Sequence, residues 1–382
     1  MTRVCPACGR RFDLLDPTWR CCSGPDGRPL PLVLAEPPAA PPSPARLRER
    51  PWDLGRYAES LGVPQEAWRL VTLGEGATPL LPAGPGVDGV WVKAEYLSPT
   101  LSFKDRGAVL LLAAARAARA RRVVVDSSGN AGTAVAAYAA RAGLPAEVYV
   151  PESTSPQKLA QVRAHGARLH LVPGRREDAA AAAARAADEP GTRYASHVYD
   201  PLFHLGTATF VYEVWEQLGG RLPDVFVLPV GNGTLVLGVA LGCAVLHAAG
   251  HVPALPRIVA VQAATCAPLG AAWRSGNADP VPVHPGPTLA EGIAIAAPAR
   301  GAEILRAVAA SGGAVVTVTD EELLAARADL AERGWYVENT AAVCWAAVRR
   351  LRRGPGAPDD PVLTGEVVLP LTGAGAKTGW SP

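Results

Sequence analysis

Short hydrophobic runs alternate along most of the chain with longer segments whose apolar residues have helical spacing. The valine-rich runs predict buried strands at residues 90–95, 122–125, 146–150, 168–172, 225–229, 258–261, 314–318 and 366–370. The alanine- and leucine-rich segments predict helices at residues 54–61, 108–120, 133–142, 155–166, 177–187 and 235–247. Strands that alternate with helices in this way indicate parallel sheets covered by helices, so the expected fold class is α/β.

The length of 382 residues and a proline-rich stretch at residues 31–51 predict more than one domain. We expect a small ribbon-like segment at residues 1–34, followed by a linker and entry segment at 35–100 that packs on the larger domain. A small α/β domain should then occupy residues 101–204, and a large α/β domain residues 205–382.

The formal net charge of +2 gives no reason to expect nucleic acid or an anionic membrane as a partner. Arginines interrupt the alanine-rich segments, so no apolar run is long enough to span a membrane. The first residues also lack the apolar core of a secretory signal, and we therefore expect a cytoplasmic protein.

Four of the seven cysteines lie within the first 22 residues. Such clustering favours metal binding or free thiols over a disulfide framework. Cys5 and Cys8 form a C-x-x-C knuckle that can share a tetrahedral zinc ion, and Cys21 and Cys22 would complete the site. Because adjacent cysteines chelate one ion poorly, a structural zinc site and a metal-free knuckle both remain open.

The strongest catalytic candidate is Lys104, in the run Leu-Ser-Phe-Lys-Asp-Arg-Gly at residues 101–107. It lies where a turn-prone loop meets a predicted helix, next to Arg106. Helix dipoles, a neighbouring cation and burial all favour the neutral amine, which is the form that makes a Schiff base with an aldehyde cofactor. The alternative is an ordinary surface lysine that pairs with Asp105.

Three further segments have the composition of binding loops. The segment Ser127, Ser128, Gly129, Asn130 joins a strand to a helix, where backbone N–H groups bind a carboxylate, although it could simply cap the helix. The glycine-rich turn Gly231, Asn232, Gly233, Thr234 precedes another helix and suits a phosphate, unless it is only a turn. Thr372 follows a buried strand and either binds a ligand or caps a glycine-rich turn.

In this order, the four motifs resemble those of fold-type II pyridoxal-phosphate enzymes, especially the threonine synthase family. Residues 73–80, 288–293 and 338–342 resemble further family segments. The resemblance implies two parallel-sheet domains of the tryptophan synthase β-subunit-like type and a homodimer. It implies that Lys104 carries pyridoxal 5′-phosphate and takes the substrate's α-proton. It also implies that Ser127, Ser128 and Gly129 hold the substrate carboxylate, that Asn130 contacts the cofactor's 3′-oxygen, that residues 231–234 hold the phosphate and that Thr372 contacts the pyridine nitrogen.

The implied reaction converts O-phosphohomoserine and water to threonine and phosphate. The alternative is elimination or replacement at Cβ of a serine-like or β-substituted amino acid, as in secondary metabolism; a third possibility is a non-catalytic homologue. The chain departs from the family pattern at four positions, since Leu101 stands for a glycine, Asn339 for a proline, and Leu205 and Ala208 for a lysine and a glutamate. Arg106, Lys158 and Arg163 remain as candidate ligands for a substrate phosphate. Ribbons like the N-terminal one occur in archaeal-type threonine synthase-like proteins.

Overall fold

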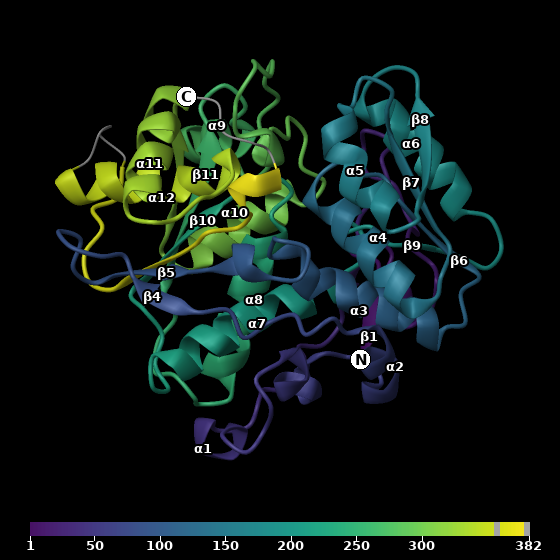
Figure 1. The fold of residues 1–382 in the computed structure, drawn as a ribbon, viewed down its shortest axis with the longest axis horizontal. Helices are drawn as coiled ribbons and strands as arrows, with labels where there is room; N and C mark the ends of the chain where they lie inside the picture. The colour runs from purple at the N-terminus through teal and green to yellow at the C-terminus, as the bar shows by residue number, and fades with distance from the viewer. Residues whose placement is uncertain (355–359, 378–382) are drawn as a thin grey trace. The chain divides into compact units, whose positions relative to one another are not determined.

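The computed structural model describes residues 1–354 and 360–377 (Figure 1). The chain forms two compact units, the first from Met1–Ala77 and Ser98–Thr209 and the second from Thr78–Leu97 and Phe210–Pro382. Residues 35–77, which we expected to pack on the larger domain, therefore belong to the first unit. The main part of the second unit begins at Phe210, five residues later than expected, because helix α7 (Leu202–Gln217) runs through the expected boundary.

The first unit is built on a four-stranded parallel sheet with the order β8-β7-β6-β9. These strands are β6 (Arg122–Val125), β7 (Ala146–Pro151), β8 (Arg168–Val172) and β9 (Thr192–Tyr194). The helices of this unit include α3 (Lys104–Ala117), α4 (Asn130–Ala142), α5 (Pro156–Ala164) and α6 (Arg176–Ala187). Helix α3 packs against α4, and α6 packs against β6, β7 and β9 (Figure 1).

The N-terminal segment adds a small antiparallel sheet with the order β2-β1-β3 to the first unit. Its strands are β1 (Thr2–Val4), β2 (Arg11–Asp13) and β3 (Val33–Leu34). Three short helices follow, namely α1 (Pro44–Leu47), η1 (Leu54–Ser60) and α2 (Gln65–Val71). Residues 31–51 are thus not wholly extended, because Pro44 starts a single helical turn that buries Leu47 completely.

The second unit contains a six-stranded sheet with the order β12-β11-β10-β13-β5-β4. Five strands are parallel, and they are β5 (Val90–Lys93), β10 (Val225–Pro229), β11 (Arg257–Ala263), β12 (Ala314–Val318) and β13 (Val367–Pro370). The edge strand β4 (Leu80–Pro82) is antiparallel. The helices are η2 (Glu95–Leu97), α8 (Thr234–Ala248), α9 (Pro268–Ser275), η3 (Glu291–Ile293), α10 (Gly301–Ala310), α11 (Asp320–Glu332), α12 (Asn339–Arg353) and η4 (Gly375–Lys377).

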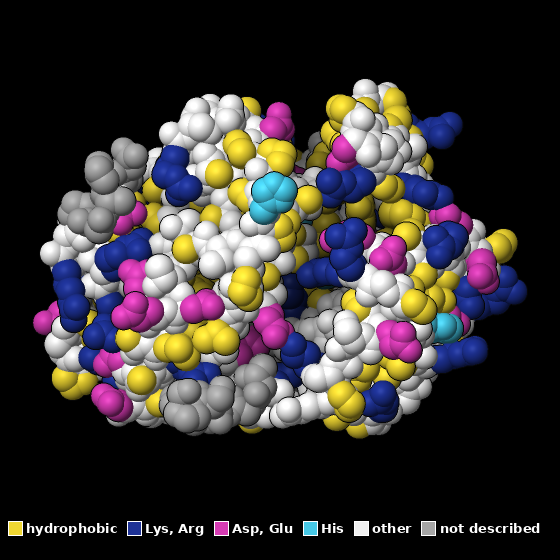
Figure 2. Space-filling view, turned by 90° about the horizontal axis from the view of Figure 1, so that it is seen from above, with side chains coloured by type: hydrophobic (Ala, Val, Ile, Leu, Met, Phe, Trp, Pro, Cys, Tyr) yellow, Lys and Arg dark blue, Asp and Glu magenta, His cyan; other side chains and the backbone are white. Residues whose placement is uncertain are grey.

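The predicted α/β class with parallel sheets is confirmed. Each sheet is buried by helices, which explains why its strands read as continuous valine runs rather than as alternating patterns. On the face seen in Figure 2, positive and negative side chains are interspersed. Among the helices of residues 1–354 and 360–377, none combines the length and apolar character needed to cross a membrane.

Candidate active site

Lys104 is the first residue of α3 and is partly buried. Its Nζ atom lies 4.8 Å from the ring centre of Phe103 and 5.4 Å from that of Phe203, at the start of α7. The amine therefore sits at the positive end of a helix and against aromatic faces. This position agrees with the environment expected for a reactive lysine.

Hydrogen bonds fix the loop that leads into Lys104. The Asp105 carboxylate accepts one bond from the backbone N–H of Thr100 at 2.7 Å and another from the Thr100 hydroxyl. Asp105 is therefore engaged in holding the loop, which argues against a role as the surface partner of Lys104. Leu101 adopts a left-handed conformation with φ of +62°, although leucine disfavours this region. Our expectation that leucine would not replace a glycine here was wrong for the backbone conformation.

The carboxylate-binding candidate, residues 127–130, connects β6 to α4 as predicted, and Asn130 is the first residue of α4. The helix is capped by Gly129, and no side chain makes the capping hydrogen bond. Ser127, Ser128 and Asn130 are partly exposed, while Gly129 is exposed. The alternative in which serine or asparagine serves only as a cap is therefore not realised.

The phosphate-binding candidate, residues 231–234, follows β10 and leads into α8, whose N-cap is Gly233 with φ of +78°. A Cβ atom on Gly231 would come within 2.9 Å of the Ile293 Cα atom, and one on Gly233 within 2.3 Å of the Ile304 Cδ1 atom. Both positions therefore require glycine. The backbone N–H groups at this helix start form a cradle of the kind that binds phosphate.

Thr372 lies directly after β13 and Leu371, and only 1% of its surface is exposed. Its hydroxyl has no hydrogen-bond partner within residues 1–354 and 360–377. A buried hydroxyl without a partner costs free energy, so such groups commonly mark a place where a ligand supplies the missing bond. The alternative in which Thr372 caps the following turn is not supported.

The second unit also brings the other resembling segments next to this site. The Glu338 N–H donates to the carbonyl of Gly373 at 3.0 Å, beside Thr372, and Val337 forms a β-bridge with Ala374. Two residues further on, the Thr340 hydroxyl accepts a bond from the Gly292 N–H at 3.2 Å. Since Ile293 packs on the phosphate cradle, residues 288–293 and 338–342 connect the two halves of this site.

The substitution of proline by Asn339 has a structural explanation. Its side-chain oxygen accepts a hydrogen bond of 2.6 Å from the nearly buried guanidinium of Arg327 in α11. This bond ties the start of α12 to α11, a contact that proline could not provide.

Not all candidate phosphate ligands are available. Arg106 is completely buried and donates to the Thr209 hydroxyl at 2.9 Å, so its role in the fold is structural. Leu205 and Ala208 are also buried inside the first unit. Lys158 and Arg163 lie on α5, where Arg163 is exposed.

The entry segment, residues 73–80, is held by two buried carboxylates. In the first unit, Glu75 accepts hydrogen bonds from Trp68 and from Tyr138 of α4, at 3.1 and 3.0 Å. In the second unit, Glu213 accepts from the Thr78 N–H at 3.2 Å and forms a buried ion pair of 2.6 Å with Lys93 of β5. Residues that looked like a family signature therefore have a clear structural task.

The four N-terminal cysteines come together at one point, with their sulfur atoms all within 4.8 Å of one another. The Sγ atoms of Cys8 and Cys21 are 3.5 Å apart, and those of the adjacent Cys21 and Cys22 are 3.9 Å apart. Four thiolates around one zinc ion lie about 3.8 Å from each other, given Zn–S bonds of about 2.3 Å. The adjacency of Cys21 and Cys22 is therefore compatible with one shared ion.

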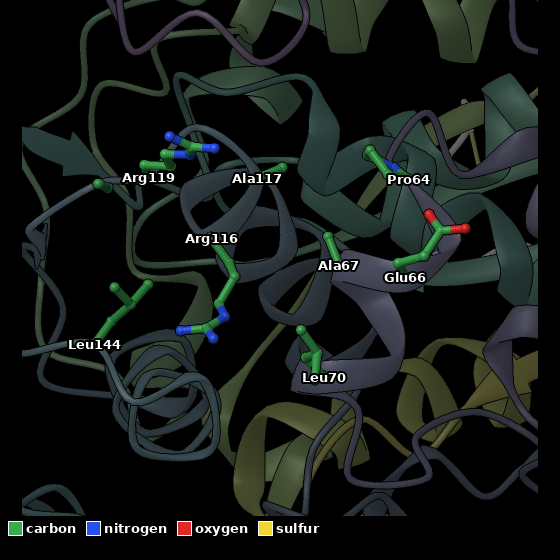
Figure 3. Close-up of a pocket in the computed structure, with 9 residues that line it drawn as sticks. Pro64, Glu66, Ala67, Leu70, Arg116, Ala117, Arg119 and Leu144 are labelled. Atoms are coloured by element: carbon green, nitrogen blue, oxygen red, sulfur yellow. The ribbon is translucent and has the colours of Figure 1, made fainter.

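A pocket of about 660 Å³ lies elsewhere in the first unit and is lined by α2, the end of α3 and Leu144 (Figure 3). Arg116 and Arg119 reach its wall from the C-terminal end of α3. Lys104 is at the other end of this helix, about 20 Å away at 1.5 Å per residue. The pocket is thus separate from the candidate catalytic lysine.

The sequence did not single out His197, which the structure places close to Lys104. Its ring lies 5.9 Å from that of Phe203, whose face Lys104 also contacts. Burial lowers the pKa of His197 well below its usual range, and the positive charges of Lys104 and Arg176 lower it further. The residue follows β9, which is only three residues long and gives a weak sequence signal.

The model of the family described as pyridoxal-phosphate dependent enzyme matches residues 71–373. The chain belongs to this family. The predicted cofactor fits the residues of the second unit, because they provide a phosphate cradle that excludes side chains and a buried hydroxyl that lacks a partner. Threonine synthase of Methanocaldococcus jannaschii is 32% identical over 360 residues, covering 92% of this chain and 87% of that protein. Threonine synthase of Mycobacterium leprae is 36% identical over 339 residues, covering 86% and 89%.

Solved structures of this pyridoxal-phosphate-dependent family agree with the fold. A bacterial threonine deaminase, from the organism abbreviated T.th., superposes with a TM-score of 0.66 at 28% identity and covers 85% of this chain and 99% of that one. Maize serine racemase superposes with a TM-score of 0.67 at 21% identity, covering 83% and 93%, and supports the fold alone. The prediction of a fold-type II enzyme of the tryptophan synthase β-like architecture is confirmed.

Proposed function

We propose that the protein is a threonine synthase-like carbon–oxygen lyase that converts O-phosphohomoserine and water to threonine and phosphate. The observation that carries this proposal is the identity of 32–36% to curated threonine synthases over most of both chains. It is supported by the placement of Lys104 at the start of α3 against two aromatic rings. When bound, the cofactor would delocalise negative charge at the substrate's α-carbon.

Each motif has a separate role in this proposal. Lys104 holds the cofactor covalently and, once released, takes the α-proton from the substrate. Residues 231–234 bind the phosphate of the cofactor through backbone N–H groups, Thr372 donates to or accepts from the ring nitrogen, and Asn130 bonds the 3′-oxygen. Ser127, Ser128 and Gly129 bind the substrate's carboxylate at the start of α4.

A second candidate is elimination or replacement at Cβ of a serine-like or β-substituted amino acid. Two observations favour it. The T.th. threonine deaminase shares the fold at 28% identity, and two positions expected to hold phosphate contacts, Leu205 and Ala208, are apolar and buried.

The deciding experiment supplies O-phosphohomoserine to the purified protein loaded with pyridoxal phosphate. Equal amounts of threonine and phosphate are expected. Borohydride should fix the cofactor to Lys104, and Lys104→Ala should abolish both the linkage and turnover, whereas the matched surface variant Lys158→Ala should keep the linkage. Absence of phosphate release, together with ammonia or a 2-oxo acid from serine or threonine, would support the second candidate instead.

We also propose that Cys5, Cys8, Cys21 and Cys22 bind one structural zinc ion, since their sulfur atoms have the spacing of a tetrahedral site. The purified protein should contain one equivalent of zinc, and Cys8→Ser should lose it, whereas Cys243→Ser, a buried cysteine of α8, should not. A protein that stays metal-free after refolding with zinc would contradict the site. The expected homodimer and cytoplasmic location stay predictions.

A further inference from the structure

Asp126 lies between the end of β6 and the proposed carboxylate loop, residues 127–130. Its Oδ1 atom accepts a hydrogen bond of 2.8 Å from the hydroxyl of Tyr194, the last residue of β9. Tyr194 is 2% exposed. Beyond the bond from the Ala195 N–H to the Val124 carbonyl, this side-chain bond extends the pairing of the two strands towards the loop.

The N-terminal segment packs on the other side of Tyr194. The ring of Trp19 meets the Tyr194 ring edge-on with 4.8 Å between ring centres and the Tyr199 ring at 5.3 Å. Trp19 is itself 6% exposed, and its indole N–H donates to Asp188 at 3.3 Å. Tyr194 is therefore held between the cysteine-containing segment and Asp126.

A buried ion-pair group fixes the same segment to the strand that carries Tyr194. Arg193 pairs with Asp200 at 2.6 Å and donates to the backbone carbonyls of Leu15 and Asp16, at 2.8 and 3.0 Å. Arg3 of β1 also lies 3.8 Å from Asp200. These contacts join β9 and the residues after it to β1 and to the turn that follows β2, so that movement of the N-terminal segment would disturb Tyr194.

We propose that Tyr194 and Asp126 are positioning residues for the carboxylate-binding loop, and that Trp19 of the N-terminal segment holds Tyr194 in place. The inference rests on the proposed role of residues 127–129 in substrate binding. The loop needs such support because its helix has no side-chain cap and its two serines are partly exposed. Burial raises the pKa of Asp126, while the Tyr194 hydrogen bond lowers it, so the bond offsets part of the cost of a buried carboxylate.

The first test compares Tyr194→Phe with Tyr149→Phe. The Tyr149 hydroxyl donates to Glu147 at 3.1 Å within β7, so its loss removes an equivalent bond that does not involve the loop. In Tyr194→Phe, the aromatic contact with Trp19 is preserved. Hydrogen exchange of residues 126–131 should become faster by about tenfold, and KM for the amino-acid substrate should rise by about tenfold with kcat within a factor of about two. Tyr149→Phe should change neither quantity.

A conservative substitution provides the second test. Asp126→Asn keeps an oxygen that accepts the Tyr194 bond and should retain most of the binding, whereas Asp126→Leu should behave like Tyr194→Phe. Trp19→Leu should also speed exchange at residues 126–131. The cofactor's absorbance should be the same in all variants, because no cofactor contact is removed.

Two outcomes would overturn the inference. Unchanged exchange at residues 126–131 in Tyr194→Phe would show that the bond does not hold the loop, whether or not the enzyme turns over any substrate. Faster exchange with an unchanged KM would show that the loop is held but does not position the substrate. A wild-type protein that turns over no amino acid would refute the proposed function, and exchange would still test the positioning.

Discussion

Leu101 shows how neighbouring hydrogen bonds can impose a backbone conformation that the residue itself disfavours. A left-handed conformation costs a non-glycine residue about 1–2 kcal/mol. Here the Leu101 N–H bonds to the Ser98 carbonyl at 2.7 Å, and the preceding Thr100 is held by Asp105. These bonds set the approach of the chain to Lys104. The sequence showed an unfavourable residue, but not the contacts that offset its cost.

Thr372 leads to a prediction at the same scale. Its unpartnered hydroxyl lowers the stability of the protein without cofactor, since an unsatisfied buried polar group costs about 1–3 kcal/mol. Thr372→Val replaces it with an apolar group of nearly the same shape. The free energy of unfolding of the cofactor-free protein should rise by about 1 kcal/mol, measured by urea denaturation.

The same substitution should weaken binding of pyridoxal phosphate about tenfold in an absorbance titration, because one hydrogen bond to the ring nitrogen is lost. Thr372→Ser keeps the hydroxyl and is the matched control, so its affinity should stay near that of the wild type. Equal affinity of Thr372→Val and the wild type would argue against a role for Thr372 in cofactor binding.

At the scale of elements, strand β5 depends on a buried ion pair. Lys93 and Glu213 are 0% and 1% exposed at the side chain, and both also bond to Thr78. Removing one member of such a pair leaves an uncompensated buried charge, which costs about 3–5 kcal/mol. Lys93→Met should therefore lower the free energy of unfolding by about this amount in denaturant titrations.

The double variant Lys93→Met/Glu213→Leu provides the control. It removes both charges, so it should be more stable than Lys93→Met alone by at least about 1 kcal/mol. A double variant that is no more stable than the single one would mean that the lost contacts to Thr78, rather than the unpaired charge, dominate.

Element prediction worked best where the hydrophobic signal was long or strong. Strands β6, β8, β10 and β12 have the predicted boundaries, because each is a buried run rich in β-branched residues. Helix α3 starts four residues earlier than predicted, and the charged run Lys104 to Arg106 concealed this start. Strands β4 and β9 were missed because each has only three residues, and their place is decided by pairing with β5 and β6.

For the molecule as a whole, His197 should contribute to acid sensitivity. Burial lowers its pKa, so the folded protein keeps the imidazole neutral, while the unfolded chain takes up a proton below its ordinary pKa of about 6.5. Unfolding is then coupled to proton uptake. The free energy of unfolding should fall as the pH decreases below about 6.5, with a contribution from this residue of at most about 1.4 kcal/mol per pH unit.

His197→Leu should reduce that slope by up to one proton when urea denaturation is followed between about pH 5 and pH 7. His284→Leu removes an exposed histidine and should leave the slope unchanged. If both variants keep the wild-type slope, the acid sensitivity arises from other groups.

The sequence by itself determined the α/β class, most strands of the two parallel sheets, and the loops that carry Lys104, residues 127–130, residues 231–234 and Thr372. These features could be predicted because strand periodicity, glycine turns and helix starts are local properties of the chain.

Only the tertiary structure decided which residues support these loops. The contact of His197 with Phe203, the bond between Tyr194 and Asp126, and the clustering of the four cysteines depend on segments far apart in the chain. The assignment of residues 35–77 to the first unit also depends on such contacts. Local propensity contains no information on these pairings, because they form only when strands and helices pack and bury polar groups that must then find partners.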